Sequence, residues 1–97
     1  MFIINLTYIK SLDEVDKYLE AHVEYLKEQY AKKNFIASGR KTPRDGGVIL
    51  SKLTSKEKLE EILAEDPFNI AKLANYEIIE FVPSMTSVEF ENLKEEI

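Results

Sequence analysis

The sequence predicts a single α+β domain whose strands and helices follow one another in the order β-α-β-β-α-β. Four short segments are rich in apolar and β-forming residues: 2–8, 35–39, 47–53 and 75–82. Segment 11–33 instead repeats its apolar residues every three or four positions, as an amphipathic helix does. Segment 54–65 combines a helix-capping pattern with the same periodicity. Two helices therefore alternate with four strands.

The composition fits one folded domain without crosslinks. The chain has 97 residues, 44% of them hydrophobic, with five Tyr and five Phe. It has no cysteine, which excludes disulfides, thiolate metal sites and cysteine nucleophiles, and its one histidine argues against structural zinc. The net charge of −5 argues against a nucleic-acid partner, and no apolar run is long enough to span a membrane. Since the N-terminus also lacks a signal-type block, we expect a cytoplasmic protein.

The first helix carries the only histidine, His22. The apolar residues expected on its buried face are Leu12, Val15, Leu19, Val23, Leu26 and Tyr30. His22 falls on this stripe, and Ser11 with Glu14 forms a capping box at the start of the helix. An imidazole ring on the buried face of a helix needs a hydrogen-bond partner, a solvent pocket or a function.

Strands 35–39 and 47–53 are predicted to form an antiparallel hairpin, because only a short loop joins them. Gly39 is interpreted as a turn residue with a positive φ angle. The loop concentrates three cations in an otherwise acidic chain: Arg40, Lys41 and Arg44. They are either solvated loop charges or a clamp for an anionic substrate.

The second helix is predicted to begin with a capping box at Thr54 and to end near Glu65. Asp66 then caps a short helix that has Pro67 at its first position. After the last strand, segment 85–97 is predicted to be a helix with a capping box from Thr86 to Glu89. We divide the chain into a domain, 1–83, and a C-terminal helical tail, 84–97.

The element order is that of a ferredoxin-like fold, with two helices on one face of a four-stranded antiparallel sheet. The other face would then expose several apolar residues: Ile3, Ile36, Ile49, Ile79 and Phe81. Because monomers rarely expose an apolar patch of this size, we expect two copies to pair their sheets face to face as a homodimer.

Three short motifs occur in order along these elements. They are Ala21-His22 followed by Tyr25-Leu26, then Ala37-Ser38-Gly39, and then Asp66-Pro67-Phe68. With these motifs the chain resembles, over about residues 1–83, the YCII-related (YciI-like) family of the dimeric α/β-barrel superfamily. The resemblance implies a dimeric bacterial or archaeal protein with a cleft between sheet and helices, where His22 and Asp66 form the functional pair.

The resemblance also suggests a range of chemistry. One relative in aromatic degradation is a dehydrochlorinase, and the superfamily includes muconolactone isomerases and oxygenases that are cofactor-free or handle haem. Many members have arginine three residues before the histidine, where this chain has Leu19, and proline where it has Arg40. The first difference removes an anion contact, and the second supplies a cation from another element.

Each candidate site residue has a structural and a functional interpretation. His22 is either a satisfied half-buried histidine or a general acid or base, since the pKa of histidine is ordinarily near neutral. Asp66 is an N-cap worth ~1 kcal/mol, and its second carboxylate oxygen could also accept a hydrogen bond from His22. Ser38, Gly39 and Arg40 are candidate substrate-binding residues. Tyr8, Tyr25 and Tyr76 are interpreted as core or interface aromatics, of which one could line the cleft.

The favoured function is an enzyme without metal or organic cofactor, in which His22 and Asp66 transfer a proton on a small ligand. The ligand is unknown and could be anionic, and the chemistry would be isomerase-like or lyase-like. One alternative is a dimeric binding or accessory protein without catalysis. Another, least favoured, is haem binding through His22.

Overall fold

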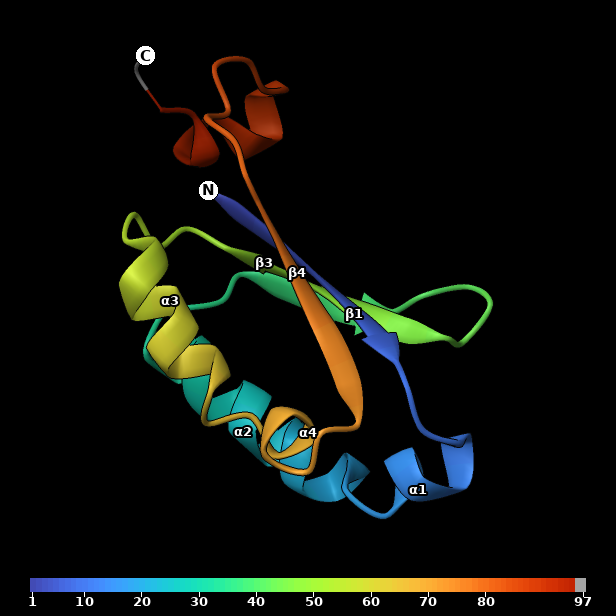
Figure 1. Ribbon diagram of the computed structural model, residues 1–97. Coiled ribbons are helices and arrows are strands. Elements are labelled where there is room, and N and C mark those ends of the chain that lie inside the picture. Colours follow the sequence, from blue (N-terminus) through green and yellow to red (C-terminus); the bar gives the residue numbers. More distant parts are fainter. Residues whose placement is uncertain (96–97) are drawn as a thin grey trace.

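The computed structural model describes residues 1–95 and contains the four predicted strands in the predicted order, with helices after β1 and after β3 (Figure 1). The strands are β1 (Phe2–Tyr8), β2 (Ala37–Arg40), β3 (Gly46–Ser51) and β4 (Ala74–Glu80). They form one antiparallel sheet in the order β2-β3-β1-β4. The predicted ferredoxin-like α+β fold is therefore confirmed.

The helices are α1 (Leu12–Asp16), α2 (Leu19–Ala31), α3 (Lys56–Leu63) and α4 (Pro67–Ile70). Figure 1 shows α2, α3 and α4 on one side of the sheet, while the other side is bare. Within residues 1–95, none of the helices is both long enough and apolar enough to cross a membrane.

The core lies between the helices and the inward face of β1. Phe2, Ile4 and Leu6 alternate along the strand and are at most 2% exposed. On the helices, Leu59 and Phe68 pack in the same cluster and are equally buried. Because full burial of one such side chain contributes ~1.5–3 kcal/mol, this layer holds α3 and α4 against the sheet.

The prediction of one helix over 11–33 was wrong, because the chain forms two helices. Ser11 caps α1 as expected, accepting a hydrogen bond from the Glu14 amide at 3.3 Å. At Tyr18 the backbone leaves the helical region, with φ −109° and ψ 1°, and α2 starts afresh at Leu19. Apolar residues spaced by three and four across this break therefore do not all lie on one helix face.

The break changes which face of α2 is buried. The buried residues are His22, Tyr25 and Gln29, whereas Leu19 and Val23 are 39% and 38% exposed. His22 thus lies on the innermost face of α2, and the apolar stripe lies to one side of it.

Several element boundaries also differ from the predictions. Ser55 rather than Thr54 caps α3, by accepting from the Lys58 amide. Asp66 caps α4 and Pro67 occupies its first position, as predicted. β2 begins two residues later than expected, and Phe35, which was assigned to it, packs in the core ahead of the strand.

The predicted C-terminal α-helix is absent from the described residues. The tail instead has a short 3-10 helix, η1 (Val88–Leu93), with a non-helical residue at Phe90 and no side-chain cap. The apolar residues Met85 and Val88 are more than 80% exposed. A short helix gains most of its stability from packing, and these residues have little to pack against. Residue 97, part of the predicted apolar side, lies outside the described residues.

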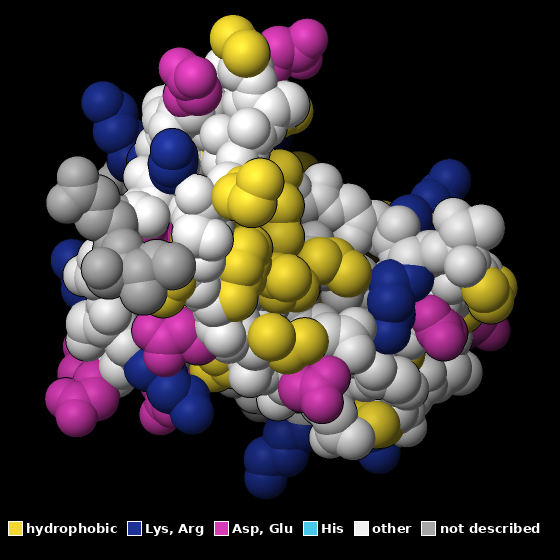
Figure 2. Space-filling model, turned by 90° about the horizontal axis from the view of Figure 1, so that it is seen from above, with side chains coloured by type: hydrophobic (Ala, Val, Ile, Leu, Met, Phe, Trp, Pro, Cys, Tyr) yellow, Lys and Arg dark blue, Asp and Glu magenta, His cyan; other side chains and the backbone are white. Residues whose placement is uncertain are grey.

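The bare face of the sheet is apolar, with one correction to its membership. Ile49 pairs with Ile4 and is 2% exposed on the helix-facing side, so its predicted place was wrong. Because pairing in register puts opposite residues on one face, Leu50 and Ile79 lie beside Ile3 on the bare face. Figure 2 views this face and shows apolar side chains gathered in its middle.

Candidate functional site

The centre of the site is a buried contact between α2 and the start of α4. The Asp66 carboxylate is fully buried, and its Oδ1 accepts from the Phe68 amide at 3.0 Å, which caps α4. His22 Nδ1 lies 2.7 Å from the same oxygen. The structure therefore brings together two residues that are 44 positions apart in the sequence.

The prediction that the two Asp66 oxygens divide these roles was wrong, because Oδ1 takes both. Oδ2 instead accepts from the Tyr76 hydroxyl of β4, at 2.5 Å. Burial first, and the nearby Asp66 charge second, raise the pKa of Tyr76 above its usual range. The phenol therefore keeps its proton and donates it, and Asp66 holds three donors from three elements.

Sequence reasoning did not assign Tyr76 to this contact. The available signal was its alternation along β4: Tyr76 pairs with Leu6, and so faces the helices. Tyr25, another of the three tyrosines considered, donates to the Ile62 carbonyl and joins the core, as expected.

The orientation of the His22 ring leaves one nitrogen free to act. A carboxylate accepts hydrogen bonds and does not donate them, so Nδ1 carries the proton of the 2.7 Å contact. The ring also stacks on Phe68, with centroids 3.9 Å apart and planes 4° from parallel. Because Nδ1 is engaged, Nε2 is the nitrogen available to a molecule in the adjoining cavity.

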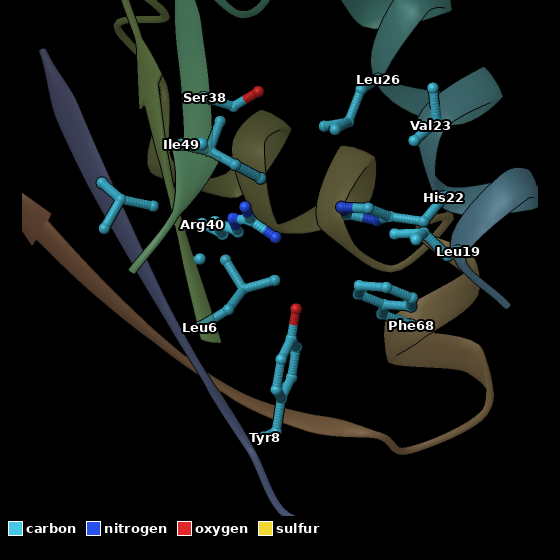
Figure 3. A pocket seen from close by; sticks show the side chains of 13 residues that line it. Leu6, Tyr8, Leu19, His22, Val23, Leu26, Ser38, Arg40, Ile49 and Phe68 are labelled. Atoms are coloured by element: carbon cyan, nitrogen blue, oxygen red, sulfur yellow. The ribbon is translucent and has the colours of Figure 1, made fainter. Parts of the chain in front are cut away.

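A cavity of about 160 Å³ lies beside His22, between α2 and the sheet. Figure 3 shows the side chains of His22 and Arg40 reaching into it from opposite walls, with the Tyr8 hydroxyl between them. The lining is Leu6, Tyr8, Leu19, His22, Val23, Leu26, Ser38, Gly39, Arg40, Gly47, Val48, Ile49 and Phe68. The walls are thus mostly apolar, with a few polar groups placed among them.

The predicted binding residues Ser38, Gly39 and Arg40 all lie at this cavity. The Ser38 hydroxyl is hydrogen-bonded to the hydroxyl of Tyr30 on α2. Gly39 has no positive φ angle, so its interpretation as a turn residue was wrong. It belongs to β2, where the chain is extended.

The other two loop cations are engaged elsewhere. Arg44 contacts the Asp16 carboxylate at 2.5 Å. Lys41 donates to Asn5 Oδ1 and Thr7 Oγ1, at 2.9 and 3.2 Å. Neither residue lines the cavity. Of the three cations that were considered as an anion clamp, only Arg40 lines it.

Comparison with known proteins identifies the family. The YCII-related domain matches residues 1–82, which is most of the chain. The chain belongs to the YCII-related family.

A solved structure similar to this YCII-related chain is the 5-chloro-2-hydroxyhydroquinone dehydrochlorinase TftG of Burkholderia phenoliruptrix AC1100, in complex with 2,5-dihydroxybenzoquinone. It aligns with a TM-score of 0.73 over 84% of this chain and 93% of TftG. At 18% identity the likeness shows a common fold. No curated protein sequence is significantly similar to the chain.

The site of this YCII-related protein is suited to proton transfer on a small molecule. A histidine nitrogen adjoins an apolar cavity, and a buried carboxylate stands behind the ring. Such a carboxylate fixes the tautomer and stabilises the imidazolium that forms when the ring takes a proton. The cavity volume of about 160 Å³ is close to that of a cavity that holds one six-membered ring.

Proposed function

We propose that this protein is a small-molecule enzyme in which His22 transfers a proton and Asp66 orients and stabilises its ring. The observation that carries the proposal is the 2.7 Å contact between His22 Nδ1 and Asp66 Oδ1 beside the cavity. The geometry meets the requirement that a general base and its orienting group lie within hydrogen-bond reach.

In the proposed reaction, His22 Nε2 removes a proton from a bound ring compound. The imidazolium is held by Asp66, whose carboxylate is itself fixed by the Phe68 amide and the Tyr76 hydroxyl. Return of the proton to another atom gives isomerisation, and loss of a leaving group gives elimination. The dehydrochlorinase TftG, named for an elimination of this kind, supports the second outcome.

The experiment is proton NMR in D₂O on a panel of enolisable single-ring compounds, including 5-chloro-2-hydroxyhydroquinone. We expect the protein to accelerate deuterium exchange or chloride loss for at least one compound. General-base catalysis contributes ~10²–10⁴-fold, so His22→Asn should lower that rate by ~100-fold or more. Asp66→Asn should lower it as well, whereas Glu65→Gln, at the exposed neighbouring position, should not.

Two results would contradict this proposal. If panel compounds bind in the cavity but none reacts, the protein is a ligand-binding protein without catalysis. If turnover persists unchanged in His22→Asn, the proton is moved by another group.

We also propose that the protein is a homodimer whose sheets pack face to face. The support is the bare sheet face, where Ile79 is 46% exposed beside Ile3 and Leu50. Phe81, which directly follows β4, is 40% exposed. A second copy presents the same apolar surface, so a two-fold axis buries both at once. The resemblance to a dimeric superfamily leads to the same expectation.

Light scattering after size exclusion tests this assembly. The wild-type protein should have twice the mass of one chain, and Ile79→Glu should dissociate it. Ile70→Glu is the matched control, because Ile70 is 68% exposed but lies on α4, away from this face. A monomeric wild type, or a dimer unaffected by Ile79→Glu, contradicts the proposed interface.

A further inference from the structure

The cavity has one cation whose charge is available to a ligand. Arg40 lies on the edge strand β2 and pairs with Gly47, which in turn pairs with Leu6. This register turns its side chain toward the helices and into the cavity (Figure 3). Within the part of the chain that the structure describes, no carboxylate lies within ion-pair distance of Arg40.

The rest of the cavity is small and mostly apolar, with the hydroxyls of Tyr8 and Ser38 in its lining. Its volume is about 160 Å³, and an apolar cavity of about 150 Å³ in another protein holds one benzene molecule. Leu6, Ile49 and Phe68 line it from the sheet and from α4, and Leu19, Val23 and Leu26 line it from α2. A bound molecule therefore has room for about one six-membered ring and small substituents.

The single guanidinium distinguishes between anions. Its planar fork can bind both oxygens of a carboxylate at once. A phosphate monoester carries nearly two negative charges at neutral pH, and the other loop cations, Lys41 and Arg44, are engaged outside the cavity. One monoanionic group therefore matches the charge that the cavity offers.

We infer that the cavity binds a single-ring carboxylate, with its carboxylate on Arg40 and its ring against Phe68 and the leucines. In this pose the far side of the ring adjoins His22 Nε2, on the wall opposite Arg40. The inference rests on the proposed function in one respect, because it takes the bound ring to be the molecule on which His22 acts. Arg40 is then the residue that selects the substrate, and His22 the residue that acts on it.

The experiment is NMR titration of the ¹⁵N-labelled protein with benzoate, 2-hydroxybenzoate and 4-hydroxybenzoate, each compared with its neutral carboxamide. We expect saturable shifts at amides lining the cavity, and at least tenfold weaker binding of the carboxamides. Arg40→Gln should weaken carboxylate binding at least tenfold and leave carboxamide binding nearly unchanged. Lys58→Gln removes one positive charge at an exposed position of α3 that does not line the cavity, and should change neither.

Three results would overturn the inference. One is equal affinity for the carboxylates and their carboxamides. The second is the same loss of affinity in Lys58→Gln as in Arg40→Gln, which would indicate general attraction to positive charge. The third is the absence of saturable binding by all three carboxylates.

His22→Asn separates this inference from the proposed function. If carboxylates bind the wild type and His22→Asn alike, through Arg40, but neither protein transfers a proton, the binding site stands and the enzymatic proposal fails. If instead the wild type transfers protons on neutral rings only, and His22→Asn does not, the enzymatic proposal stands and the carboxylate specificity is wrong.

Discussion

Replacement of Asp66 by alanine should lower stability far more than the loss of an ordinary helix cap. The Asp66 carboxylate accepts from the Phe68 amide, from His22 Nδ1 and from the Tyr76 hydroxyl. Alanine removes all three acceptor contacts at a position that is fully buried. The capping contact is local to α4, whereas the other two join α2 and β4 to it.

The magnitude follows from these contacts. Loss of an N-cap costs ~1 kcal/mol. Each donor that is left without an acceptor inside the fold costs a further ~1–3 kcal/mol. Here the two are the buried His22 Nδ1–H group and the partly buried Tyr76 hydroxyl. Even with the lowest of these values, Asp66→Ala should reduce the free energy of unfolding by about 3 kcal/mol. Since small domains are stable by only ~5–15 kcal/mol, the variant should be visibly weakened.

Urea unfolding followed by circular dichroism measures this difference. Ser55→Ala is the matched control, because Ser55 caps α3 through one exposed contact to the Lys58 amide; it should cost ~1 kcal/mol. In addition, Tyr76→Phe should cost less in the Asp66→Ala background than in the wild type, because its donor has already lost its acceptor. The reasoning is refuted if Asp66→Ala and Ser55→Ala lower stability equally, since Asp66 would then act as a cap alone.

Two further predictions concern close packing and alkaline pH. A Cβ atom on Gly46 would lie 1.7 Å from the Leu6 carbonyl oxygen, whereas one on Gly39 would have no neighbour within 4 Å. Gly46→Ala should therefore lower the free energy of unfolding by ~1–3 kcal/mol or more, while Gly39→Ala should leave it nearly unchanged. Equal urea midpoints for the two variants would contradict the close contact between Gly46 and the Leu6 carbonyl. Burial first, and the Asp66 charge second, raise the pKa values of Tyr25 and Tyr76 in the folded state. The stability linked to these protons is complete below the unfolded-state pKa of about 10 and is lost as the pH rises through the folded values. Thermal melts between pH 9 and pH 11, in steps of roughly half a unit around the unfolded-state pKa, should show this loss of stability. Tyr76→Phe should make the loss smaller. An unchanged pH dependence in the variant would count against the Tyr76–Asp66 contact.

The local features of this chain were predictable from its sequence. The alternation of strand residues, the helical periodicity and the caps at Ser11 and Asp66 depend on residues within a few positions of one another. These features determined the element order and the fold class. The motifs around His22 and Asp66, read together, pointed to the family and to that pair.

The contacts between distant residues were decided by the tertiary structure. The break at Tyr18 sets which face of α2 is buried, and strand register places Ile49 inside and Leu50 on the bare face. Tyr76 meets Asp66 because β4 packs beside α4. Arg40 lies at the cavity because β2 pairs with β3 in one particular register. Periodicity specifies which residues share a face of one element, but packing against the other elements decides what that face contacts.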